Sequence, residues 1–117
     1  MEASRRMSEL LESLVDQTRA GRIRWRRGSP EGFVYPARTG SVAVRRVGIP
    51  AVGWRYEVLA LDKVGEPLES VTDDDSSMAG VREHGEARAK LLWDLAFHQN
   101  AEGSPELDRL LSEVRGA

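Results

Sequence analysis

The hydrophobic positions along the chain first follow a helical period and then change to a strand-like period at Gly21. Apolar side chains recur at steps of three and four residues from Met7 to Thr18, which is the pattern of an amphipathic helix. Gly21 is a natural residue to end this helix, because glycine adopts a left-handed conformation without steric cost. The pattern therefore predicts a helix over about residues 4–20.

An alternating pattern follows this glycine and predicts strands. Ile23 and Trp25 alternate with arginines, as in a strand that buries one face. Further strands are expected around residues 33–36, 42–46, 54–61 and 67–71, and 54–61 should lie centrally because both its faces are apolar. The links between them are too short for parallel crossovers, so we expect an antiparallel meander.

Two helices are predicted after a polar, acidic loop at residues 72–80. The first covers about residues 81–100, and Ser104-Pro105 marks the start of the second, because an N-cap serine followed by proline is a common helix start. The second helix has an apolar stripe made of Leu107, Leu110, Leu111 and Val114. The whole pattern predicts one α+β domain over residues 1–117, with an N-terminal helix, a four- to five-stranded antiparallel meander sheet and two C-terminal helices packed on one face.

Composition is that of a globular protein. The 117 residues fit one domain, with 40% hydrophobic and 31% charged residues. Because cysteine is absent, disulfides, thiolate metal sites and thiol catalysis are excluded. No apolar run approaches the length of a membrane helix, and the N-terminus lacks the apolar stretch of a signal peptide. We therefore expect a cytoplasmic protein without membrane contact, and the preference for arginine over lysine is typical of a GC-rich bacterial genome.

The net charge of −2 is unevenly distributed. Residues 1–55 hold 11 arginines against 5 acids, whereas residues 56–117 hold 6 basic residues against 14 acids. Such asymmetry indicates either an anionic partner for the first half or attraction between the two halves of one domain. The basic residues of the first half give the first candidate site, made of Arg22, Arg24, Arg26, Arg27, Arg45 and Arg46.

This arginine cluster has two interpretations. If Ile23 and Trp25 are buried, the alternate arginines stand together on an open strand face, with Arg45 and Arg46 nearby across the sheet. Guanidinium groups in a row suit phosphate or carboxylate, which points to a nucleic acid or an acidic protein surface. The other interpretation is a solvated strand face that pairs with the chain's own acids, and the overall acidity favours it.

Trp93 and Phe97 form the second candidate site. They are spaced i, i+4 and fall on a different side of their helix from the expected core stripe. Either the helix is sandwiched between the sheet and another helix, or the aromatic pair meets a partner protein or a second copy of the chain. We expect the first interpretation more than the second.

No other group of residues indicates chemistry. Asp73, Asp74 and Asp75 do not have the spacing of a calcium loop and suit a loop that precedes a helix N-terminus. His84 and His98 lie too far apart along one helix to share a metal. We therefore expect no catalytic residue, no metal and no cofactor.

The string from Leu11 and Leu14 through Thr18 and Gly21 to Ile23 and Trp25 resembles the start of uncharacterised short bacterial and phage proteins. In these proteins a helix likewise ends in glycine before a strand with a tryptophan. The resemblance implies the fold and no activity. We therefore expect a non-enzymatic interaction, adaptor or regulatory module that binds a protein partner or itself, with a nucleic-acid-binding protein that uses the arginine face as the alternative.

Overall fold

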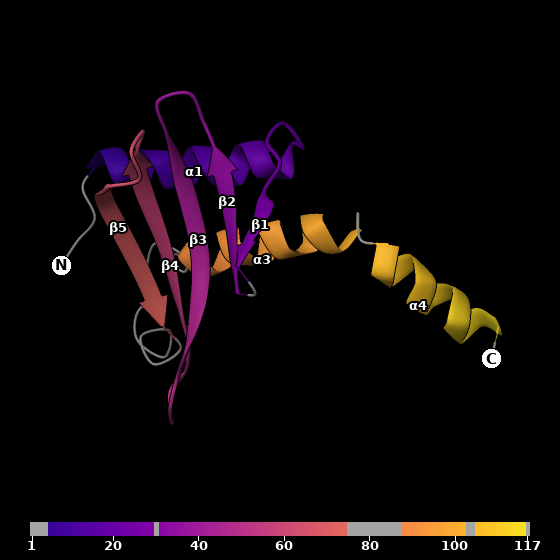
Figure 1. The fold of residues 1–117 in the computed structure, drawn as a ribbon. Coiled ribbons are helices and arrows are strands. Elements are labelled where there is room, and N and C mark those ends of the chain that lie inside the picture. Colours follow the sequence, from indigo (N-terminus) through magenta and orange to yellow (C-terminus); the bar gives the residue numbers. More distant parts are fainter. Residues whose placement is uncertain (1–4, 30, 75–87, 103–104, 117) are drawn as a thin grey trace.

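The computed structural model describes residues 5–29, 31–74, 88–102 and 105–116, which form three helices and five strands (Figure 1). The predicted α+β class and the order of elements are confirmed. The elements in chain order are α1 (Arg5–Arg19), β1 (Arg26–Ser29), β2 (Gly32–Pro36), β3 (Gly40–Ile49), β4 (Gly53–Asp62), β5 (Pro67–Asp74), α3 (Arg88–Glu102) and α4 (Pro105–Gly116).

The strands form the expected antiparallel meander, in the order β1-β2-β3-β4-β5. Phe33 of β2 pairs with Val44 of β3, and Val44 pairs with Val58 of β4. This row of residues is almost completely buried. Since side chains alternate across a strand, the same register turns Arg46 to the core face and Arg45 to the opposite face. β4 is paired on both sides, as its two apolar faces predicted.

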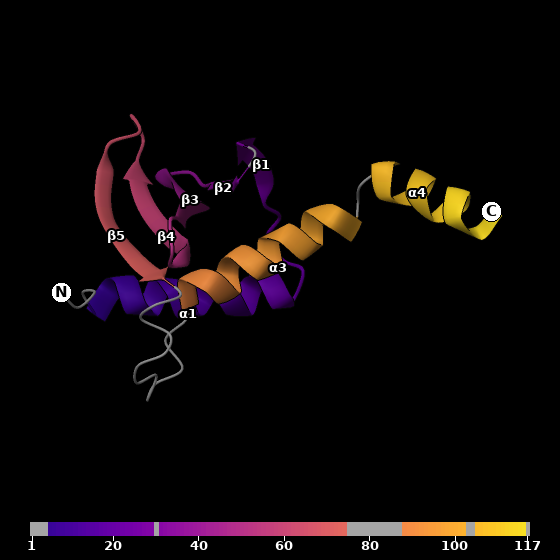
Figure 2. The same cartoon turned by 90° about the horizontal axis from the view of Figure 1, so that it is seen from below.

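Helices α1 and α3 lie side by side on one face of the sheet (Figure 2). The apolar stripe of α1 packs there, with Met7, Leu11, Leu14 and Val15 buried. From α3 the side chains of Ala89, Leu92, Trp93 and Ala96 enter the same core. None of the described helices is long and apolar enough to cross a membrane.

The end of α1 has the geometry that Gly21 predicted. Gly21 adopts a φ of 73°, a conformation that glycine takes without steric cost. The Gly21 N–H donates to the Thr18 carbonyl and the Arg22 N–H donates to the Gln17 carbonyl, both at 3.0 Å. These two hydrogen bonds are those of a Schellman motif, which satisfies carbonyls at the helix end and turns the chain toward the sheet.

Several predicted boundaries differ from the structure. Residues 22–25 are not a strand, because β1 begins at Arg26. Gly28 and Ser29, which lie outside the predicted strands, belong to β1, and β5 continues through residues 72–74, which were expected in a loop. The predicted first turns of the helix over residues 81–87 lie outside the described residues.

Of the two C-terminal helices, α3 makes the extensive contacts with the sheet and with α1. Helix α4 follows α3 and extends away from the sheet in both views (Figures 1 and 2). It contains no buried residue.

Candidate interaction surfaces

Arg22, Arg24 and Arg26 are the arginines of the first candidate site that are exposed and have no partner among the described residues. All three are exposed, while Trp25 between them is buried. In the part of the chain that the structure describes, none of the three guanidinium groups has an ion pair or a hydrogen bond. The predicted inward position of Trp25 and outward position of its neighbours are thus both observed, although strand alternation is not the cause.

Side chains of α3 hold residues 23–25 in place. The Trp25 N–H donates to Gln99 Oε1 at 2.7 Å, and Gln99 Nε2 donates to the Ile23 carbonyl at 2.9 Å. Asn100 Nδ2 donates to the Trp25 carbonyl at 3.0 Å. The backbone N–H and C=O groups of this segment therefore form hydrogen bonds with amide side chains instead of with a neighbouring strand. No local pattern signals this role, because Gln99 and Asn100 lie 74 to 76 residues further along the chain.

The remaining arginines of the first candidate site do not join this group. Arg45 lies on the open face of the sheet, where its Nε is 2.5 Å from Oε1 of Glu57 on the neighbouring strand. Arg27 lies over the ring of Phe33, with 5.2 Å between the guanidinium carbon and the ring centroid. The Arg45 contact is the pairing with the chain's own acids that the alternative interpretation of the arginine cluster expected, whereas the Arg27 contact is with an aromatic ring.

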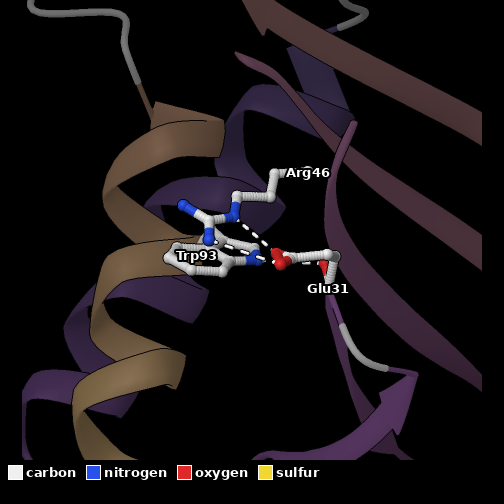
Figure 3. A network of polar contacts seen from close by, with 3 residues as sticks. All are labelled: Glu31, Arg46 and Trp93. Atoms are coloured by element: carbon white, nitrogen blue, oxygen red, sulfur yellow. Dashed lines mark hydrogen bonds and ion pairs between the residues drawn. The ribbon is translucent and has the colours of Figure 1, made fainter. Parts of the chain in front are cut away.

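Arg46 lies on the covered face of the sheet, between two tryptophan rings. Its guanidinium carbon is 4.0 Å from the ring centroid of Trp54 and 4.2 Å from that of Trp93. Its Nε donates to Oε2 of Glu31 at 2.6 Å (Figure 3). The planar guanidinium group can stack on both rings while its edge meets the carboxylate. The prediction that Arg46 belongs to an open arginine face is therefore corrected, because consecutive strand residues point to opposite faces.

Glu31 connects the β1–β2 turn to both the sheet and α3. Its backbone carbonyl accepts from the Arg46 N–H at 3.0 Å and from Trp93 Nε1 at 3.2 Å. The hydrogen bond from Arg46 lowers the pKa of Glu31 below its ordinary value, against the opposing effect of partial burial. The same hydrogen bond raises the pKa of Arg46. Glu31, Arg46 and Trp93 thus form a structural cluster that joins the sheet to the helix layer.

Only one member of the predicted aromatic pair reaches the surface. Trp93 is 5% exposed and makes edge contacts with Phe33 and Tyr56 in the core. Phe97 stacks on Trp93 with 5.1 Å between ring centroids and keeps 38% of its surface exposed. Trp93 is therefore a core residue, as expected if the helix packs within the fold. An interface role stays a prediction for Phe97 alone.

Helix α4 presents a larger apolar surface, which the sequence analysis treated as an ordinary helix stripe. Its aliphatic side chains are between 45% and 67% exposed. A hollow of about 420 Å³ lies where α3 meets α4, lined by Arg27, Phe97, Asn100, Ala101, Pro105, Glu106 and Leu107. Phe97 and the apolar stripe of α4 are thus parts of one continuous surface, which we call the elbow surface: Phe97, Ala101, Leu107, Leu110, Leu111 and Val114.

The acidic stretch at the end of β5 has a structural role. Asp73 is buried, and its Oδ2 accepts a hydrogen bond from the Ala89 N–H at 2.9 Å. This contact fixes the start of α3 against the sheet, which agrees with the prediction that acids precede a helix N-terminus. Asp75 and His84 lie outside the described residues, and His98 is an exposed residue that contacts the ring of Phe97.

A second hollow lies at the β2–β3 and β4–β5 turns, open to solvent and lined partly by Arg38, Asp62 and Lys63. Among residues 5–29, 31–74, 88–102 and 105–116, no group of three metal-ligating side chains comes together. Comparisons with family models, with curated proteins and with solved structures give no match, so the resemblance to short bacterial and phage proteins stays a prediction.

Proposed function

We propose that this chain is a non-enzymatic interaction module that binds protein through the elbow surface. The observation that carries this proposal is the exposure of α4. Four aliphatic side chains lie on one stripe of this helix, and none of them is buried by the rest of the described chain. Scattered apolar residues on a surface are ordinary, whereas a contiguous apolar stripe beside an exposed aromatic ring marks an interaction site.

The physics of short helices supports the same function. Helices shorter than about 12–15 residues are marginal in water, and most helical stability in proteins comes from packing an apolar face. Helix α4 has 12 residues, and none of them is buried within the described chain. Acids in its first turn and Arg115 in its last turn favour the helical form, yet each contributes only about 0.3–1 kcal/mol. A partner that covers the stripe would supply the missing stabilisation.

A substitution on the apolar stripe tests this function. Tagged full-length chain with Leu110→Ser and Leu111→Ser should lose any protein that the unchanged chain retains, because the contact side chains are gone. The matched control is Arg109→Ser with Ser112→Ala, which changes the opposite side of the same helix. Quantitative mass spectrometry of the retained proteins, an untagged copy of the chain included, is the measurement. Equal retention by both variants and the unchanged chain would exclude the elbow surface as the binding site.

Nucleic-acid binding is the second candidate function. Arg22, Arg24 and Arg26 are exposed guanidinium groups without a partner in the described part of the chain, which supports this candidate. Phosphate-driven affinity falls steeply with salt, so binding of a labelled oligonucleotide should weaken as the salt concentration rises. Reversing all three charges to glutamate should abolish it, and a triple variant that binds equally well would reject this candidate. A cytoplasmic location is part of both proposals.

A further inference from the structure

We propose that the occupant of the elbow surface is the same surface of a second copy of this chain, with the two α4 helices packed antiparallel about a two-fold axis. This inference rests on the proposed function and names its partner. It follows from three features of α4: the symmetry of its apolar stripe, the charges on its flanks and the area that it can bury.

The apolar stripe of α4 reads the same in both directions. Its members are Leu107, Leu110, Leu111 and Val114, which are spaced symmetrically about the midpoint between Leu110 and Leu111. An antiparallel pair centred on that midpoint places Leu107 opposite the second copy's Val114, and Leu110 opposite the second copy's Leu111. Two-fold dimers require such a self-complementary patch, in which each residue meets its counterpart reciprocally.

Charges on one flank of the stripe favour the antiparallel direction. At 100° per residue, Asp108 and Arg115 lie on the same side of the stripe and near opposite ends of the helix. A two-fold axis across the pair brings Asp108 beside the second copy's Arg115, twice per dimer. The other flank carries Glu106 and Glu113, which would meet their counterparts as like charges. Arg109 lies three and four residues from these two acids on the same helix and offsets their charge.

The apolar area of the two α4 helices alone is too small for a specific interface, so the contact must extend beyond α4. Each aliphatic side chain can bury roughly 60–120 Å², so eight of them supply on the order of 700 Å². A specific interface needs about 1,000 Å² or more. The rest comes from the hollow between α3 and α4, because Leu107 lines it and the second copy's Val114 lies opposite Leu107. The second copy's helix end would thus reach Phe97, which keeps 38% of its surface exposed.

The arrangement of the fold leaves room for this approach. Helix α4 extends away from the sheet and from α1, so a second α4 can lie along it without meeting the sheet of the first copy (Figure 2). The interface is small, and we therefore expect association in the micromolar range rather than a permanent dimer.

Sedimentation velocity of the full chain between about 1 and 500 µM tests the pairing. The mean mass should rise with concentration from 13.0 kDa toward twice that value. Leu110→Glu should weaken association at least about a hundredfold, because two charges would be buried in the centre of the pair. Ser112→Glu, on the opposite side of the helix, should leave association unchanged. A mass that stays at one copy across the range overturns the proposal.

A charge exchange tests the antiparallel geometry. Asp108→Arg and Arg115→Asp, each alone, should weaken self-association by roughly three- to tenfold, because like charges then meet at both ends of the pair. Mixing the two variants should restore association, since every arginine then faces an aspartate of the other chain. Circular dichroism of each variant checks that the helix content is retained. Absence of restoration in the mixture would overturn the antiparallel arrangement.

Failure of this inference can be distinguished from failure of the proposed function. If the chain stays monomeric and the Leu110→Ser, Leu111→Ser variant still loses another protein, self-pairing is wrong and the interaction module stands. If the chain stays monomeric and that variant loses nothing, both are wrong. Association that Leu110→Glu does not weaken places the dimer contact elsewhere and overturns the inference.

Discussion

Arg46 and Trp93 stack where the sheet meets α3, with 4.2 Å between the guanidinium carbon and the indole centroid. Trp54 lies over the same guanidinium group, and Glu31 accepts its hydrogen bond at the edge. A cation among aromatic rings beside the core is stable here because its charge is compensated and its planar faces are covered. The residue that the sequence suggested for an open anion-binding face thus acts as a cross-link between layers.

Replacing Arg46 should destabilise the fold, whereas replacing its neighbour Arg45 should not. Arg46→Ala loses both ring contacts and leaves Glu31 without its cation, and we expect the free energy of unfolding to fall by roughly 2–3 kcal/mol. Arg46→Lys keeps a charge but not the planar fork, and should lose about half as much. Arg45→Ala removes an exposed ion pair and should stay within about 0.5 kcal/mol. Urea unfolding of the three variants is the measurement, and equal losses for the two alanine variants would contradict it.

The Glu31 carboxylate predicts a pH dependence of stability. Its pKa is lowered in the folded state below the ordinary 4.5, by the hydrogen bond from Arg46. A group with a depressed folded pKa stabilises the protein above its unfolded pKa, and this contribution disappears as pH falls through the folded pKa. Glu31→Gln should therefore be less stable than the unchanged protein near neutral pH. Because the carboxylate is partly exposed, the difference should stay below about 1 kcal/mol.

The same pair of proteins checks the direction of this effect. Urea unfolding between about pH 3 and pH 7 should show the two free energies converging at the acidic end, because protonated Glu31 and glutamine are both neutral. A gap that widens toward low pH would contradict the assigned ion pair.

Gln99, a half-buried residue of α3, should be more important for stability than an ordinary polar helix residue. Gln99→Ala removes two hydrogen bonds to the backbone around Trp25, and we expect a loss of about 1–2 kcal/mol. Gln99→Glu should also destabilise, since a carboxylate can accept from the Trp25 N–H but cannot donate to the Ile23 carbonyl. His98→Ala changes the adjacent exposed residue and should have little effect. Urea unfolding of the variants, followed by circular dichroism, is the measurement.

Substitution by alanine should destabilise the fold at Gly21 and Gly40 but not at Gly116. Gly21→Ala places a side chain on a residue with positive φ and should cost about 1 kcal/mol, although the surrounding space is empty. Gly40→Ala should cost more than about 2 kcal/mol, because a Cβ there would collide with the backbone carbonyl of Leu61. Gly116→Ala, at the open end of α4, should be neutral or slightly stabilising. Thermal unfolding gives the ranking, and a neutral Gly40→Ala would show that the β3–β4 pairing is looser than observed.

The sequence by itself determined the type and order of the elements and which of their residues face the core. The three- and four-residue steps ending at Gly21 fixed α1, and alternation in β3 and β4 decided which residues face the core, because burial of apolar area follows these periods. The inward position of Trp25 was also predictable, since a tryptophan among arginines is by far the most apolar group available.

The tertiary structure decided which surfaces remain open. Alternation in β3 places Arg46 on the core face with Val44, but it could not show that the guanidinium group stacks between Trp54 and Trp93, because those rings come from other elements. The anchoring of residues 23–25 by Gln99 is equally non-local. Periodicity likewise marked the stripe of α4 as apolar without saying whether it is covered, because a helical pattern specifies a face and not the molecule that packs against it. Only the structure shows that this stripe is uncovered, and for that reason α4 is the candidate interaction site.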